Sequence, residues 1–305
     1  MAKVERKPRI AILGSGSVGG FLATIFYNYG YNVCCIGSNK SINDINQNGI
    51  TLNSKKFGRL HAKPDVSINL NHKVDLLFIT VKSPFLNDAI KYVINSNQEI
   101  KAIIPLLNGI EHIDYLRRKL GNNLIVGMIT GQFIRENHTY LKHTTSHVKI
   151  DLASADLSFV QLSKAAKIIS NTGIDVKIHE TETNVVWEKL VKLNALACTT
   201  VASMKSLGSI RLDKFWKKKL KEIIKEGASV AKADGANIIE NNIIQDIQQL
   251  PAELSTSLQR DIQKGVPSEF DSIIGAVIRK GEYHNIECKI MKDLYHKIKY
   301  RYKLS

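Results

Sequence analysis

Short apolar runs alternate with amphipathic stretches through the first part of the chain, the pattern of strands that alternate with helices. The strongest apolar runs are Ile10–Leu13, Tyr31–Ile36, Val74–Val81, Ala102–Leu107 and Leu124–Phe133. Shorter strand patterns occupy Ile50–Leu70, Leu141–Leu152 and Asp175–His179, and we expect the strands of Leu141–Leu152 to be antiparallel. Because strands that alternate with helices form parallel sheets, we predict an α/β fold with a Rossmann-type, doubly wound sheet.

Beyond Glu182 the chain shows helical periodicity and no further strand pattern. We expect helices over Val185–Met204, Leu212–Asp234, Asn237–Leu250, Glu253–Lys264, Ser268–Lys280 and Ile286–Tyr300. The sequence therefore predicts two domains, with residues 1–180 forming the sheet domain and residues 181–305 an all-helical C-terminal domain.

A glycine-rich turn follows the first strand. Its residues are Gly14, Ser15, Gly16, Ser17, Val18 and Gly19, and a helical pattern runs from Phe21 to Asn28. A strand, a G-x-G-x-x-G turn and a helix in this order are typical of dinucleotide-binding folds, where the pyrophosphate lies on the N–H groups at the helix start. We therefore predict that these residues bind a dinucleotide; the alternative is a plain glycine turn.

The end of the second predicted strand bears on which dinucleotide is bound. NAD-specific folds tend to place Asp or Glu there, to accept hydrogen bonds from the ribose 2′-hydroxyl. Here Ser38, Asn39 and Lys40 follow the strand, and the first acid is Asp44. A hydroxyl, an amide and an ammonium suit a 2′-phosphate, so NADP(H) is favoured over NAD. The alternative is a polar loop with NAD held in another way.

Two polar residues follow later strands. Ligands of open α/β sheets bind beyond the carboxyl ends of the strands, where Lys82 and Asn108 stand. Lys82 is a candidate for binding a phosphate or a substrate carboxylate, or else a surface lysine that opens a loop. Asn108-Gly109 is a candidate ligand contact, or else a simple turn, which this dipeptide favours by itself.

The predicted helix Val185–Met204 is apolar nearly all round, which indicates a buried helix. Lys189 in its early turns must therefore reach the surface or lie in a cleft. A desolvated ammonium has a lowered pKa and suits a general acid. Ser257 and Asp261 lie one helical turn apart, and Glu269 opens the next helix, where an acid can simply complement the helix dipole.

Composition narrows the class of protein. The chain has 305 residues and a net charge of +15, but its lysines are scattered, so we expect no nucleic-acid partner. A basic surface can attract an anionic cofactor and substrate, but a lysine-rich composition without a special role is more common, so the charge alone selects no function. The apolar runs are too short for a membrane span, and the first nine residues lack the apolar core of a signal peptide. Four cysteines without metal-ligand spacing predict no metal site and a reducing, cytoplasmic location.

Together these motifs resemble the ketopantoate reductase (2-dehydropantoate 2-reductase) family. Beside the glycine turn, the matching segments are Val81-Lys82, Leu107-Asn108-Gly109, Trp187-Glu188-Lys189-Leu190, Ser257-x-x-x-Asp261 and Ser268-Glu269-Phe270-Asp271. The resemblance implies an NADP-binding domain over residues 1–180 and a helical substrate-binding and catalytic domain over residues 181–305, with NADP(H) in the cleft between them. The implied reaction reduces ketopantoate to (R)-pantoate on the way to pantothenate and coenzyme A.

The resemblance also implies roles for single residues. Lys189 resembles the general acid that protonates the developing alkoxide, and Ser257 resembles the residue that binds the substrate carboxylate. Asn108 is expected to contact both cofactor and substrate, as is Lys82. Glu269 is expected at the cofactor ribose, and Gln132 at the cofactor through its backbone.

Several positions depart from the family pattern. Family members often carry Asn four and eight residues after the catalytic lysine, where this chain has Leu193 and Ala197. The nearest amide is Asn194, which we take as a candidate substrate contact although it lies about 100° away around the helix. The Arg that often binds the 2′-phosphate is Ser38 here, with Lys40 as a possible substitute. A different 2-keto acid substrate, or a non-catalytic NADP(H) sensor, therefore remains an alternative. We expect a monomer or a homodimer.

Overall fold

The computed structural model describes residues 6–304. The chain divides into two compact units. One, the sheet unit, comprises residues 1–107 and 113–182; the other, the helical unit, comprises residues 108–112 and 183–305. The short segment Asn108–His112 thus belongs with the helices although it follows a strand of the sheet, which the single predicted boundary near residue 180 does not include.

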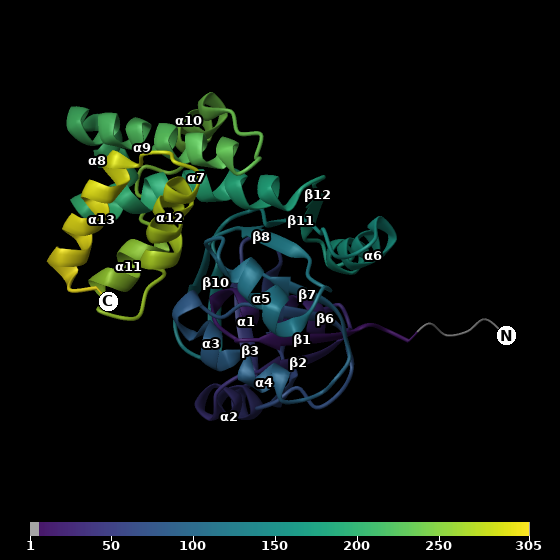
Figure 1. The fold of residues 1–305 in the computed structure, drawn as a ribbon. Coiled ribbons are helices and arrows are strands. Elements are labelled where there is room, and N and C mark those ends of the chain that lie inside the picture. Colours follow the sequence, from purple (N-terminus) through teal and green to yellow (C-terminus); the bar gives the residue numbers. More distant parts are fainter. Residues whose placement is uncertain (1–5, 305) are drawn as a thin grey trace. The chain divides into compact units, whose positions relative to one another are not determined.

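The centre of the sheet unit is a five-stranded sheet in the order β5-β2-β1-β6-β7, in which every strand pairs in parallel with its neighbours (Figure 1). Its strands are β1 Arg9–Leu13, β2 Asn32–Ile36, β5 Asp65–Ser67, β6 Val74–Ile79 and β7 Ile100–Pro105. The inner strands are buried along nearly their whole length, as the continuous apolar runs require of a sheet covered on both faces. This confirms the predicted α/β fold with a parallel sheet.

Two smaller sheets complete the unit, in the orders β4-β3-β10-β9 and β12-β11-β8. Their strands are β3 Ile50–Ser54, β4 Gly58–Ala62, β8 Val126–Thr130, β9 Phe133–Arg135, β10 Tyr140–His143, β11 Lys149–Ala153 and β12 Asp175–Ile178. The antiparallel strands expected within Leu141–Leu152 are confirmed in part: β10 is antiparallel to β9 and β11 is antiparallel to β8, but β10 also pairs in parallel with β3 and β11 with β12. The partners are distant in sequence, so local alternation does not reveal them.

Helices pack against these sheets. They are α1 Ser17–Asn28, α2 Asn39–Asn48, the 3-10 turn η1 Ser83–Phe85, α3 Leu86–Ala89, α4 Lys91–Ile94, α5 His112–Leu120 and α6 Phe159–Ser170. Helix α1 contributes two aromatic contacts to this packing: the ring centroids of Phe21 and Phe133 are 4.7 Å apart, and those of Phe26 and Phe78 are 5.4 Å apart. The sequence analysis missed α2, because only Ser41 and Ile45 of its ten residues are buried and the apolar signal is weak.

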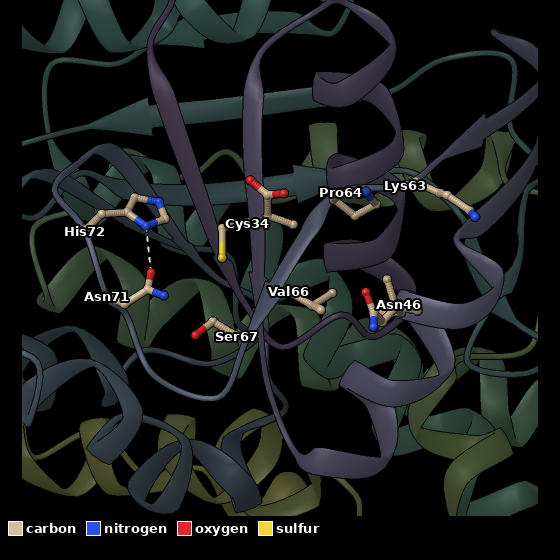
Figure 2. A pocket seen from close by; sticks show the side chains of 10 residues that line it. Cys34, Asn46, Lys63, Pro64, Val66, Ser67, Asn71 and His72 are labelled. Carbon is tan, nitrogen blue, oxygen red and sulfur yellow. Dashed lines mark hydrogen bonds between the residues drawn. The ribbon is translucent and has the colours of Figure 1, made fainter.

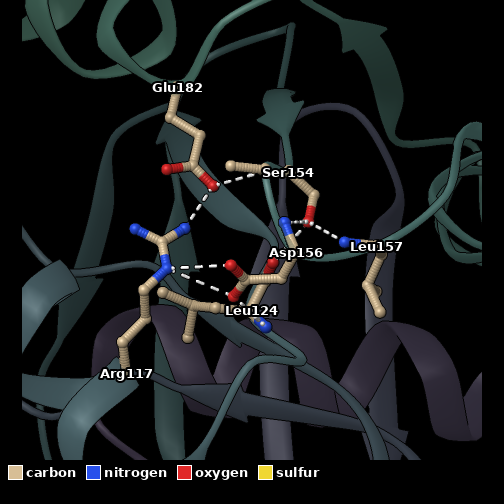
Figure 3. Close-up of polar contacts among 7 residues, drawn as sticks. Arg117, Leu124, Ser154, Asp156, Leu157 and Glu182 are labelled. Carbon is tan, nitrogen blue, oxygen red and sulfur yellow. Dashed lines mark hydrogen bonds and ion pairs between the residues drawn. The ribbon is translucent and has the colours of Figure 1, made fainter.

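A network of charged groups joins three segments of the sheet unit (Figure 3). Arg117 of α5 donates to the carboxylate of Asp156 over 3.0 Å and to Glu182 over 2.5 Å. Asp156 also accepts the N–H of Leu124, and Glu182 accepts the N–H of Ala155. Glu182 is the first residue of the long helix α7, so this network fixes where that helix begins.

The helical unit consists of α7 Glu182–Ser203, α8 Leu207–Leu212, α9 Lys214–Ala233, α10 Glu240–Gln249, α11 Ser257–Gln263, the π-helical turn η2 Asp271–Gly275, α12 Ala276–Tyr283 and α13 Lys289–Tyr302. The all-helical prediction is confirmed, although α8 is additional and α11 is shorter than predicted. Helix α7 is buried almost all round, as its apolar pattern predicts. Within residues 6–304, no helix has both the length and the apolar character to cross a bilayer.

A buried hydrogen bond fixes α7 against α9. The indole N–H of Trp187, a residue with no exposed surface, donates to Asp234 over 2.8 Å. Asp234 also binds Lys280 over 2.9 Å and His284 over 3.0 Å. Burial alone would raise the pKa of Asp234, but hydrogen bonds from these three partners bring it below its ordinary value of 3.8. The ionised carboxylate is thus the form that the fold prefers.

We expect Asp234→Ala to lower the free energy of unfolding by about 1–3 kcal/mol at pH 7, because the indole N–H of Trp187 loses its acceptor. Since the folded pKa is depressed, the stabilisation is fully present above the unfolded pKa of about 3.9 and is lost as the pH falls through the lower, folded pKa. Urea unfolding at pH 7 and at about pH 2.5 therefore yields a smaller difference from wild type at the lower pH. Asp246→Ala, which removes an exposed ion pair with Lys192, is the control and changes stability by less than about 1 kcal/mol.

Candidate functional site

The glycine turn connects β1 to α1 and has the geometry of a phosphate-binding loop. Gly14 has a φ of +92°, and a side chain there would collide with Val81. Gly16 is the N-cap of α1, and open space surrounds the position that its Cβ would take. The first N–H groups of an α-helix have no partner within the helix, and Gly16 has no side chain to accept them. The turn therefore offers backbone donors in an open approach, which suits a phosphate.

The predicted 2′-phosphate residues lie at the start of α2. Ser38 is the N-cap of this helix and makes no side-chain capping bond, and the exposed Lys40 lies in the first turn. The glycine turn is tied to the same helix, because the buried Ser15 hydroxyl lies 2.9 Å from that of Ser41. The sheet unit thus places a second helix N-terminus, a hydroxyl and an ammonium close to the glycine turn.

Lys82 and Gln132 also belong to the sheet unit. Lys82 is half-buried, immediately follows Val81 against the glycine turn, and precedes the 3-10 turn η1. Gln132 lies in the exposed link between β8 and β9, and its carbonyl already accepts the N–H of Thr144 over 3.1 Å. Its own N–H donates to the hydroxyl of Thr145 over 3.3 Å. The expected backbone contact of Gln132 with a cofactor would have to share these groups.

Within the helical unit, the structure brings Lys189, Asn108 and Glu269 together. The ammonium of Lys189 donates to Asn108 Oδ1 over 3.0 Å, and Asn108 Nδ2 donates to Glu269 Oε2 over 2.8 Å. Glu269 is only 8% exposed, and Lys189 is partly buried on α7. The Asn108 amide therefore bridges a cation and a buried anion.

The charges on either side fix the orientation of the Asn108 amide. If the amide were turned over, its NH₂ group would face the Lys189 ammonium and its oxygen would face the Glu269 carboxylate. Both contacts would be repulsive, so only one orientation satisfies the neighbours. Asn108 therefore holds the Lys189 Nζ at a defined place.

A second set of contacts fixes the segment that carries Asn108. Gly109 has a φ of +96° and packs so closely on the backbone of Ser272 that a side chain would collide with the Ser272 carbonyl. Two residues on, the carboxylate of Glu111 accepts two hydrogen bonds from Arg279, over 2.7 and 2.8 Å. The sequence analysis missed Glu111 and Arg279, because they are 168 residues apart and no local pattern links them.

The other predicted substrate residues lie elsewhere in the helical unit. Ser257 is exposed at the first position of α11, whose N-cap is Thr256. Asn194 is 1% exposed; its amide nitrogen donates to the Ile273 carbonyl over 2.9 Å, and its oxygen accepts the thiol of Cys198. The nitrogen of the Asn194 side chain thus ties α7 to η2, and its oxygen is used within α7. This geometry argues against the substrate contact expected for Asn194.

A cavity of about 480 Å³ lies at the edge strand β5 of the sheet unit (Figure 2). Its lining includes Cys34, Asp65 and His72, and no residue predicted for the site lines it. Burial and then the nearby Asp65 raise the pKa of the Cys34 thiol to about 11, so the nucleophilic thiolate is scarce at neutral pH.

Across residues 6–304, no group of three His, Cys, Asp or Glu side chains is arranged to hold a metal ion.

Comparison with known proteins identifies the family. The N-terminal domain of the family described as ketopantoate reductase PanE/ApbA matches residues 10–157, and the C-terminal domain of the same family matches residues 183–301. The chain belongs to the ketopantoate reductase family. It is an oxidoreductase of that family, and the resemblance recognised in the sequence motifs is confirmed.

Relatives and solved structures agree over nearly the whole chain. The 2-dehydropantoate 2-reductase of Pyrococcus horikoshii is 25% identical over 290 residues, covering 92% of this chain and 93% of the relative. The structure of 2-dehydropantoate 2-reductase from Geobacter metallireducens superposes with a TM-score of 0.87 at 19% identity, covering 96% of this chain and 99% of that one. A D-mandelate dehydrogenase solved with NADH and anilino(oxo)acetate also gives a TM-score of 0.87 at 19% identity, with 97% and 98% covered. These two likenesses show the shared fold.

We expect Gly16→Ala to leave the melting temperature unchanged, because its backbone is ordinary and space is open around a Cβ there. The methyl group that the substitution adds would occupy the approach to the α1 N-terminus, so the affinity for NADPH falls at least about tenfold. Gly19→Ala is the contrasting variant, since its Cβ would collide with the Gly14 carbonyl and lower the melting temperature itself. Fluorescence titration with NADPH and thermal unfolding measure the two effects. Wild-type affinity in Gly16→Ala would exclude the glycine turn as the pyrophosphate site.

Proposed function

We propose that this ketopantoate reductase family member reduces 2-dehydropantoate (ketopantoate) to (R)-pantoate with NADPH, with Lys189 as the general acid. The observation that carries the proposal is the linked set of Lys189, Asn108 and Glu269, in which an ammonium is held by an amide whose orientation the neighbouring charges dictate. A reductase of a ketone needs a proton donor at a fixed place beside the carbonyl oxygen, and this arrangement supplies one.

The cofactor is NADP(H), and the sheet unit has groups suited to its phosphates. The glycine turn and the α1 N-terminus fit the pyrophosphate, since Gly16 leaves the backbone open to approach. The α2 N-terminus, with Ser38 and Lys40, fits the 2′-phosphate in place of the Arg that the family often uses. Lys82 is assigned to the nicotinamide end and the substrate. When bound, NADPH supplies the hydride that adds to the ketone carbon.

The chain's own residues manage the proton and the charges. Lys189 Nζ donates a proton to the ketone oxygen as negative charge develops on it, and the neutral amine then regains a proton from solvent. Asn108 keeps Nζ in place through its oxygen while its NH₂ group is held by Glu269. Ser257 is assigned to the substrate carboxylate and Glu269 to the cofactor ribose. Since the cysteines are all buried free thiols, we place the reaction in the reducing cytoplasm.

A second candidate is a 2-keto acid with an apolar side chain. Leu193 follows Lys189 by one helical turn, so both lie on the same side of α7, and Leu193 is half-buried. Ala197, one turn further, is fully buried. Neither residue can donate a hydrogen bond to a substrate hydroxyl, and an apolar group fits beside Leu193. A non-catalytic NADP(H) sensor is disfavoured, because binding alone gives no reason to orient an ammonium through an amide.

We expect Lys189→Ala to lower kcat with the preferred 2-keto acid by a factor of about 10²–10⁴, the usual contribution of a positioned acid. NADPH affinity stays within about twofold of wild type, because Lys189 is not assigned to the cofactor. NADPH absorbance during turnover and a fluorescence titration measure the two quantities. Lys192→Ala, on the same helix but paired with the exposed Asp246, is the matched control. Undiminished turnover in Lys189→Ala would remove the lysine from its role.

The substrate is identified with a matched pair: ketopantoate and 3,3-dimethyl-2-oxobutanoate, which lacks only its hydroxyl group. A preference for ketopantoate of more than about tenfold in kcat/KM supports the first candidate and excludes the apolar one. We expect Leu193→Asn to shift this ratio towards ketopantoate by about tenfold, since a new amide one turn from Lys189 can bind the hydroxyl. An unchanged ratio would show that Leu193 does not contact the substrate side chain.

A further inference from the structure

Arg279 of α12 binds two carboxylates at once. Its Nε and Nη2 donate to the two oxygens of Glu111 over 2.7 and 2.8 Å. Its Nη1 and Nη2 donate to the two oxygens of Asp271 over 3.0 and 2.9 Å. Both pairs have the two-pronged geometry in which a guanidinium fixes direction as well as distance.

Each of these carboxylates lies close in sequence to a residue of the proposed site. Glu111 follows Asn108 by three residues within the segment Asn108–His112, and Asp271 follows Glu269 by two residues at the start of η2. Arg279 therefore ties the segment that carries Asn108 to the turn that carries Glu269. The bond between Asn108 and Glu269 spans the same two segments.

Arg279 is itself firmly placed on its Asp271 side. The Tyr295 hydroxyl of α13 donates to Asp271 Oδ1 over 2.8 Å, and the Tyr295 ring stacks on Phe270 with centroids 4.6 Å apart. On the other side, the contacts that fix the course of Asn108–His112 include the tight glycine turn, the two bonds of the Asn108 amide and the Glu111 carboxylate. The positive charge of the Arg279 guanidinium also offsets the repulsion between the Glu111 and Asp271 carboxylates.

We propose that Arg279 is a positioning residue for this site, acting through Glu111 and Asp271 to hold Asn108 against Glu269 and so to aim the Lys189 ammonium. The inference rests on the proposed function for the meaning of the site. Its structural part, that Arg279 orders Asn108–His112, can be tested without any turnover.

The first test measures hydrogen–deuterium exchange of peptides that cover residues 108–112 in the full-length protein. We expect Arg279→Ala to accelerate exchange of these amides at least about tenfold, and Glu111→Gln to do so in the same direction. Lys192→Ala, which removes an exposed ion pair elsewhere in the helical unit, leaves them unchanged. All three ion-pair partners are about half-exposed, so the variants are expected to fold; should Arg279→Ala fail to do so, Arg279→Lys and Glu111→Gln serve instead. Unchanged exchange in the folded variants would overturn the proposal.

The second test asks whether Arg279 acts through Asn108. We expect Arg279→Ala to lower kcat about 10- to 100-fold with the KM for NADPH little changed, and Arg279→Lys to recover part of the loss. In an Asn108→Ala background the same substitution lowers kcat less than about twofold further, because the residue it positions is gone. A full, additive loss in that background would overturn the proposed route. If none of the 2-keto acids tested supports NADPH oxidation by the wild-type enzyme, the proposed function fails. The exchange experiment still decides the role of Arg279 in that case.

Discussion

The Asn108 amide stands between the Lys189 ammonium and the buried Glu269 carboxylate, and the geometry of the helical unit around Lys189 is built on this bridge. Glu269 is 8% exposed, and a carboxylate withdrawn from water that far needs a donor. Asn108 provides it, and in doing so turns its oxygen towards the Lys189 ammonium. A lysine side chain has several freely rotating bonds and does not by itself hold its Nζ in one place. The Asn108 oxygen, whose orientation is fixed by the bond from the amide nitrogen to Glu269, gives Nζ a defined position. The Glu269 carboxylate thus orders the Lys189 ammonium through the Asn108 amide.

This constraint explains why a short segment after the sheet packs with the helices. Asn108 reaches Glu269 only if the chain turns sharply after β7, and Gly109 permits the turn through its positive φ and its contact with the Ser272 backbone. The Asn108-Gly109 dipeptide therefore has two linked roles. The Asn108 amide binds the Lys189 ammonium, and Gly109 allows the turn that places this amide beside Glu269. The turn and the ligand contact, which stood as alternatives for this motif in the sequence, are compatible.

Local patterns predicted what depends on neighbouring residues. The buried strands, the glycine turn and the burial of α7 follow from apolar periodicity, and the structure agrees. Pairing between distant segments could not be predicted, so the partners of β10 and the contact between Glu111 and Arg279 appear only in three dimensions. Asn194 shows the limit of helical spacing: one residue's displacement around α7 turns its amide into the interior, where it binds the Ile273 carbonyl.

Helix α7 carries the proposed proton donor, Lys189, and the residue proposed to contact the substrate side chain, Leu193, on successive turns. Lys189 depends on Asn108 and Glu269, which reach it from other parts of the helical unit, and none of these contacts involves Leu193 or Ala197. Under the proposed function, substitutions at the latter positions can therefore change which 2-keto acid is accepted without moving the proposed proton donor. Under the proposed function one scaffold can keep the reaction while the substrate changes, because the amide that contacts Lys189 lies outside α7 whereas Leu193 lies on the next turn of α7.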